Sequence, residues 1–171
     1  MNLFAGAPVW LLAILVLALI AAAVEDAARL RISNVTVLVV LGTAIVAAIV
    51  EGPSLSLWQN ALLFLVILAL GTAAFAGGWL GGGDVKLFAA AALWADLRIA
   101  LWLVALVFLS GGLLAIAYLA SRPLRRSSGG KRIPYGIAIA AGTLAVMALS
   151  RGYLQDHSRP LPPIKIIRTS A

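Results

Sequence analysis

The sequence has no cysteine, a single histidine and few charged residues, and each shortage excludes a kind of chemistry. Without cysteine the chain forms no disulfide, has no thiolate nucleophile and builds no cysteine-ligated metal or iron–sulfur site. The single histidine, His157, lies in a polar carboxy-terminal stretch, so neither a histidine metal cluster nor a Ser-His-Asp triad is expected. Charged residues make up 11% of the chain, against about 25% in soluble domains.

Hydrophobic residues dominate instead, at 63% of the 171 residues, where soluble domains have roughly 45–50%. A water-soluble domain of this length could not bury so much apolar surface, which excludes a soluble enzyme and a nucleic-acid-binding domain. The net charge of +7 therefore indicates basic loops beside anionic lipid rather than contact with nucleic acid. We predict an integral membrane protein, with the lipid bilayer as its surroundings.

Long apolar runs predict an all-α polytopic membrane protein, because a spanning helix needs about 20 apolar residues. Six transmembrane helices are expected near residues 7–25, 34–51, 56–77, 84–96, 98–121 and 134–150. The helix at 84–96 is too short to span alone and has to pack among its neighbours. We assign residues 1–154 to a single six-helix transmembrane domain and residues 155–171 to a flexible polar tail.

The distribution of lysine and arginine predicts the orientation in the membrane. With the amino terminus outside, the inner loops hold eight of these cations and the outer loops one, although four more in the tail then lie outside. We therefore expect both termini outside. The basic run 121–132 is expected to be a solvated loop that sets topology, with recruitment of an acidic or lipid partner as the alternative. Most of the five tryptophans fall near the ends of predicted helices, as in the interfacial aromatic belts: Trp10, Trp58, Trp79, Trp94 and Trp102.

Two of the six acidic residues have no simple explanation at membrane depth, where ionisable groups are costly. The other four fall at helix ends, at turns or in the tail: Glu25, Glu51, Asp96 and Asp156. Asp26 lies at the inner end of the first predicted helix, and Asp84 follows three glycines at the start of the fourth. Asp84 is equally compatible with a helix cap after a glycine turn.

If the first and fourth helices lie side by side, these two carboxyl groups share one depth and one proton. One carboxylate then activates a water molecule while its protonated partner polarises a peptide carbonyl, which is chemistry that needs no cofactor. We expect neither a cofactor nor a bound metal. The alternatives are a small proton-coupled transporter subunit that uses the same acids as proton carriers, and a catalytically inactive scaffold protein.

Three short motifs carry a family resemblance. Residues 81–86 read Gly-Gly-Gly-Asp-Val-Lys, a GxGDxK pattern, and residues 26–34 read Asp-Ala-Ala-Arg-Leu-Arg-Ile-Ser-Asn. Residues 131–142 contain Pro-Tyr-Gly and lead into the last predicted helix. Together, and in this order, the motifs resemble those of the type IV prepilin peptidases, which are GxGD aspartyl proteases. Ser33 stands where the family motif has proline, a change expected to have little effect on the chemistry.

The resemblance implies an aspartic-type endopeptidase that removes the leader of prepilins or prepilin-like proteins at the cytoplasmic face of the bacterial inner membrane, with pilus assembly machinery as a further partner. It implies Asp26 and Asp84 as the catalytic pair. The candidate substrate-binding residues are Gly81, Gly82, Gly83, Lys86, Pro134, Tyr135 and Gly136. The lack of cysteine matches the short, peptidase-only branch associated with Flp-type pili, although archaeal preflagellin peptidases share this layout.

Three expectations concern the neighbours of the aspartates. An extended substrate segment is expected to pair its backbone with the glycines before Asp84, as in strand addition. Lys86 either adjusts the charge of the carboxyl pair and anchors substrate, or extends its ammonium to the membrane interface. Asn34 is expected to cap the second helix.

Overall fold

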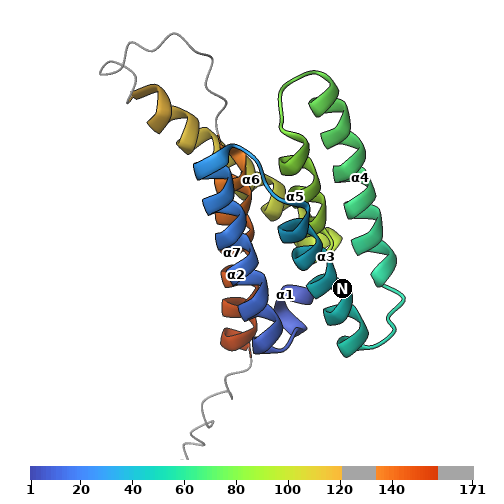
Figure 1. The fold of residues 1–171 in the computed structure, drawn as a ribbon. Coiled ribbons are helices and arrows are strands. Elements are labelled where there is room, and N and C mark those ends of the chain that lie inside the picture. Colours follow the sequence, from blue (N-terminus) through green and yellow to red (C-terminus); the bar gives the residue numbers. More distant parts are fainter. Residues whose placement is uncertain (121–133, 158–171) are drawn as a thin grey trace, which may run out of the picture.

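The computed structural model describes residues 1–120 and 134–157, and every element within these ranges is a helix (Figure 1). The elements are α1 (Leu3–Gly6), α2 (Val9–Arg29), α3 (Asn34–Glu51), α4 (Leu57–Ala76), α5 (Gly82–Ala92), α6 (Leu97–Ala120) and α7 (Tyr135–His157). Five of them, α2, α3, α4, α6 and α7, are long and apolar enough to cross a membrane. The protein is therefore the all-helical polytopic membrane bundle that its composition predicts.

The short helix α5 is held inside the bundle. Its 11 residues extend about 16 Å at 1.5 Å per residue, roughly half of a 30 Å hydrocarbon core. It packs against α3, α4 and α7, and Leu87 and Ala89 through Ala92 are almost fully buried. This arrangement agrees with the prediction that the helix near 84–96 packs among its neighbours. The amino-terminal helix α1 was not predicted, because a four-residue helix leaves no periodic signal.

The structure covers only part of the carboxy-terminal region for which the sequence predicts a basic loop at 121–132 and a tail from residue 155. Helix α7 continues through His157, beyond the predicted end at 150. The rest of the tail predicted from residue 155, and the basic run 121–132, lie outside the described residues.

The turn between α2 and α3 is built by Glu25 and Ser33. The Ser33 Oγ accepts a hydrogen bond from the backbone N–H of Thr36 at 3.1 Å and so caps α3. The prediction that Asn34 is the cap was wrong, because Ser33 has the extended backbone of a cap and Asn34 is already helical. Glu25 accepts hydrogen bonds from the Ser33 N–H at 2.8 Å and from the Thr36 hydroxyl at 3.1 Å. Leu30 ends α2 in the left-handed conformation, with φ of 52°.

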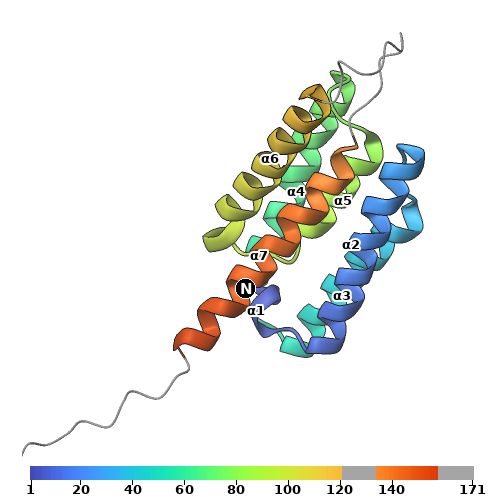
Figure 2. The same cartoon turned by 90° about the vertical axis from the view of Figure 1, so that its left-hand side faces the viewer.

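The turns and helix ends fall at two opposite ends of the bundle. The α2–α3 and α4–α5 turns, the end of α6 and the start of α7 lie at one end (Figure 1). The N-terminus, the α3–α4 connection and the end of α7 lie at the other. Helix α2 packs against α3 and α7, and α6 packs along α7 (Figure 2).

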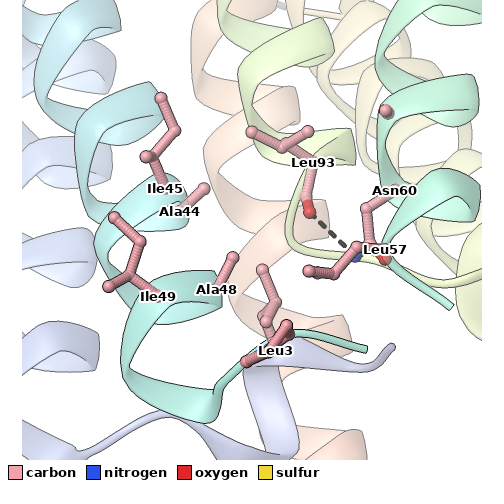
Figure 3. Close-up of a pocket in the computed structure, with 10 residues that line it drawn as sticks. Leu3, Ala44, Ile45, Ala48, Ile49, Leu57, Asn60 and Leu93 are labelled. Carbon is pink, nitrogen blue, oxygen red and sulfur yellow. Dashed lines mark hydrogen bonds between the residues drawn. The ribbon is translucent and has the colours of Figure 1, made fainter. Parts of the chain in front are cut away.

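At the N-terminal end of the bundle, one buried amide joins three segments. The Asn60 side chain, on α4, donates to the Leu93 carbonyl at 2.9 Å (Figure 3). It also donates to the Met1 carbonyl at 2.8 Å. Beside it lies an apolar cavity of about 460 Å³ lined mainly by α3 and α4. Trp94 is fully buried here, stacked on Phe4 at 5.6 Å, so its predicted place in an interfacial belt was wrong.

Candidate functional site

Asp26 and Asp84 line the same cavity at the opposite end of the bundle. The cavity has a volume of about 290 Å³ and is lined by Asp26, Leu30, Phe75, Gly78, Trp79, Leu80, Gly81, Asp84 and Tyr135. Both aspartates are buried, with 4% and 8% of their surface exposed. Two carboxyl groups from distant parts of the chain thus lie in one cavity of a membrane bundle. Burial of ionisable groups in a membrane protein is costly, so such a pair indicates a functional site.

The start of α7 holds Asp26. The backbone N–H of Gly136 donates to Asp26 Oδ2 at 2.6 Å, and this bond is buried. A Cβ atom at position 136 would lie 2.9 Å from Asp26 Oδ2 and 2.8 Å from the Ile32 side chain. Only glycine therefore lets α7 approach closely enough to form this hydrogen bond.

Asp84 is the third residue of α5. Its Oδ2 accepts a hydrogen bond from the Gly81 N–H at 3.1 Å, so the carboxyl closes the first turn of the helix as a cap would. Its Oδ1 is also buried but has no hydrogen-bond partner among the described residues. An unpartnered buried carboxyl oxygen is costly, and helix capping by Oδ2 does not account for it.

The two carboxyl groups line one cavity, although Asp26 comes from α2 and Asp84 from α5. Their helices do not form a main packing pair, however. α2 and α5 each pack against α3 and α7, and these two helices connect them. The expectation that the two aspartate-bearing helices lie side by side is therefore corrected: α3 and α7 set the relative position of the two side chains.

The predicted substrate-binding residues divide into two groups. Gly81 and Tyr135 line the cavity with the aspartates. The other five do not line it: Gly82, Gly83, Lys86, Pro134 and Gly136. Gly136 still contacts the site through its hydrogen bond to Asp26.

Gly83 and Lys86 face structural neighbours instead of the cavity. A Cβ at Gly83 would lie 3.1 Å from Ile32 Cβ, so this glycine allows the start of α5 to pack on the α2–α3 turn. The exposed Lys86 ammonium donates to Asn34 Oδ1 at 3.1 Å, which ties α5 to α3. These contacts explain both residues without a bound substrate.

The segment before the glycines contributes cavity residues that sequence reasoning missed. Gly78, Trp79 and Leu80 line the cavity, and Gly78 has a φ of 75°, which favours glycine. Trp79, which is 80% exposed, was predicted only as an interfacial residue and not as part of the site. Its position three residues before Gly82 in a turn between two apolar runs was the available signal.

Within residues 1–120 and 134–157, no three histidine, aspartate or glutamate side chains gather as a metal site would require. The expectation that the protein works without metal or cofactor stays a prediction.

Fold and cavity together define a polytopic helical membrane protein with two buried carboxyl groups at one end. The chain belongs to the type IV leader peptidase family, whose model matches residues 13–116. That range contains both aspartates and ends before α7. It is thus a type IV leader peptidase-like membrane protease. Neither a curated protein nor a solved structure matches the chain.

Proposed function

We propose that the protein is an aspartic-type endopeptidase that removes the leader of Flp-type prepilins or prepilin-like proteins, with Asp26 and Asp84 as its catalytic pair. The observation that carries the proposal is one cavity that holds both buried carboxyl groups, with Asp84 Oδ1 left without a partner among the described residues. A water molecule or a peptide carbonyl is the kind of group that would satisfy this oxygen.

The two carboxyl groups share one proton, because two ionised carboxylates that are buried around one small cavity repel each other at high cost. Asp26 receives the shorter backbone hydrogen bond, which favours its ionised form, and Asp84 carries the proton. Asp26 takes a proton from water as the water oxygen attacks the peptide carbonyl carbon, and Asp84 donates a hydrogen bond to the carbonyl oxygen. The C–N bond then breaks, and the leaving nitrogen takes a proton from the pair.

The site faces the cytoplasm in this proposal. Arg29, Arg31 and Lys86 flank the two aspartates in sequence, and the connection from α6 to α7 adds five lysines and arginines. The excess of cations in these connections favours the inner side of the membrane. A prepilin presents a short basic leader in the cytosol and an apolar helix in the bilayer, so the bond to be cut lies at this interface.

The test compares Asp26→Asn and Asp84→Asn with Glu51→Gln, each co-expressed with a small prepilin-like protein. Both aspartate variants are expected to lose leader removal by at least about 10³-fold, because a water must be activated by the intact pair. Glu51 lies at the end of α3 outside the cavity, so its amide variant should process normally. Undiminished processing by either aspartate variant would refute the mechanism and favour the transporter or scaffold alternative.

A further inference from the structure

A second, apolar cavity opens beside the aspartates and continues into the bundle. It has a volume of about 530 Å³ and is lined by residues of α4, α5, α6 and α7 and of the connection between α4 and α5. It is lined by Ala74, Trp79, Leu80, Asp84, Phe88, Val107, Phe108, Gly111, Gly112, Ala115, Tyr135, Ala138 and Ile139. We call it the α4–α6 groove.

The groove is continuous with the cavity of the aspartates. Four residues line both: Trp79, Leu80, Asp84 and Tyr135. From there it extends one helical turn along α5 to Phe88 and along α7 to Ile139. On α6 it runs from Ala115 to Val107, about 12 Å at 1.5 Å per residue. A helix that starts at the aspartates and lies in the groove would thus contact it over roughly two turns.

The wall formed by α6 has room for side chains of a bound segment. A Cβ at Gly112 would meet nothing within 4 Å, whereas Gly111 is buried and faces Tyr135 and Ala138. Phe108 remains 71% exposed one turn away. Apart from Asp84 and Tyr135, the lining side chains are apolar or small, so an apolar segment fits and a charged one does not.

We propose that the α4–α6 groove binds the apolar helical segment of the substrate that directly follows the scissile bond. This inference rests on the proposed function. Continuity with the aspartate cavity favours a substrate segment over a lipid chain: the peptide bond at the end of such a helix is placed next to Asp84, whereas a lipid chain gains nothing from that position. Side chains of the first two turns would enter beside Gly112, and their size would set substrate preference.

The first measurement fills the groove from the protein side. Gly112→Phe adds a ring at a groove position where a Cβ would meet nothing within 4 Å, so the side chain starts into open space and takes the place of the substrate helix; thermal unfolding of the variant checks that the bundle is intact. Gly42→Phe is the matched control, because Gly42 lies within a spanning helix, also has nothing within 4 Å of its Cβ, and does not line the groove. We expect Gly112→Phe to lower kcat/KM by about tenfold, mainly through KM, and Gly42→Phe to stay within about twofold of wild type.

The second measurement locates the substrate directly. A photoreactive phenylalanine analogue replaces Phe108 in the Asp26→Asn background, which keeps the substrate uncut, and the same analogue at the exposed Leu38 of α3 is the control. Position 108 should crosslink to the apolar segment of the substrate within two turns of the scissile bond, and position 38 should not.

The proposal requires both results. If wild-type enzyme removes the leader but Gly112→Phe cleaves equally well, or if position 108 gives no crosslink, the groove assignment is overturned while the proposed function stands. If wild-type enzyme removes no leader from any prepilin-like protein, the proposed function fails and the groove assignment fails with it.

Discussion

Replacing Gly136 by alanine tests whether this glycine positions Asp26 for catalysis, as distinct from stabilising the fold of α7. The added Cβ would lie 2.8 Å from Ile32 Cδ1, where contacting carbon atoms prefer about 3.5–4.0 Å, and 2.9 Å from Asp26 Oδ2, which is also too close for a non-bonded contact. Either α7 or the Asp26 side chain has to move by several tenths of an ångström or more. The 2.6 Å hydrogen bond from the Gly136 N–H is then lengthened or lost.

The expected cost is catalytic rather than structural. A displacement of about 1 Å at a reacting group lowers the rate by about 100-fold, so kcat of Gly136→Ala should fall by one to two orders of magnitude. Alanine is also the better helix former, by about 1 kcal/mol within a helix, which offsets part of the strain in α7. The variant should therefore insert and fold while it cleaves slowly.

The assay follows leader removal from a purified prepilin-like substrate by gel shift, with the enzyme in detergent or vesicles and its thermal unfolding recorded in parallel. Gly152→Ala is the control, because it changes another glycine of α7 whose Cβ would meet nothing within 4 Å. Wild-type kcat in Gly136→Ala would refute the argument that this glycine positions Asp26. Loss of folding in Gly136→Ala together with loss of cleavage would refute the claim that the effect is local.

Two further predictions concern the same site. Glu25→Ala removes the acceptor of the Ser33 N–H and the Thr36 hydroxyl in a half-exposed turn, so the free energy of unfolding should fall by about 1 kcal/mol and cleavage should slow. Glu25→Gln keeps an acceptor and should therefore recover part of the stability, measured by thermal unfolding, and part of the cleavage rate, measured by gel shift. The rate of leader removal should pass through a maximum as pH is varied, because the pair works with one proton; a rate that only rises or only falls across the range of stable folding would contradict the shared proton.

Much of the architecture could be predicted along the chain, because helix formation in a membrane depends on local apolar length. The expected helix at 34–51 has the bounds of α3, and the expected spans near 56–77 and 98–121 differ from α4 and α6 by one residue at each end. The failures were also local. Ser33 rather than Asn34 caps α3, and α1 was too short to detect.

The environment of the aspartates could be predicted only in part. The motifs placed both acids at one end of the protein, and the structure brings them to one cavity. The glycines were expected to receive substrate, yet Gly83 accommodates Ile32 and Gly136 accommodates Asp26. Trp94 likewise lies in the core, because its indole N–H reaches the Val40 carbonyl at 3.3 Å. Each of these contacts joins segments far apart in the chain.

Sequence alone determined that this chain crosses a membrane, where its apolar helices begin and end, and which two acids stand out at membrane depth, since hydropathy and charge act on each segment separately. The tertiary structure decided that α3 and α7 set the spacing of those acids, that Gly136 holds Asp26, and that a groove leads away from Asp84. Such features depend on how closely distant helices approach one another, and that distance is set by side-chain packing across the whole bundle rather than by any single stretch of residues.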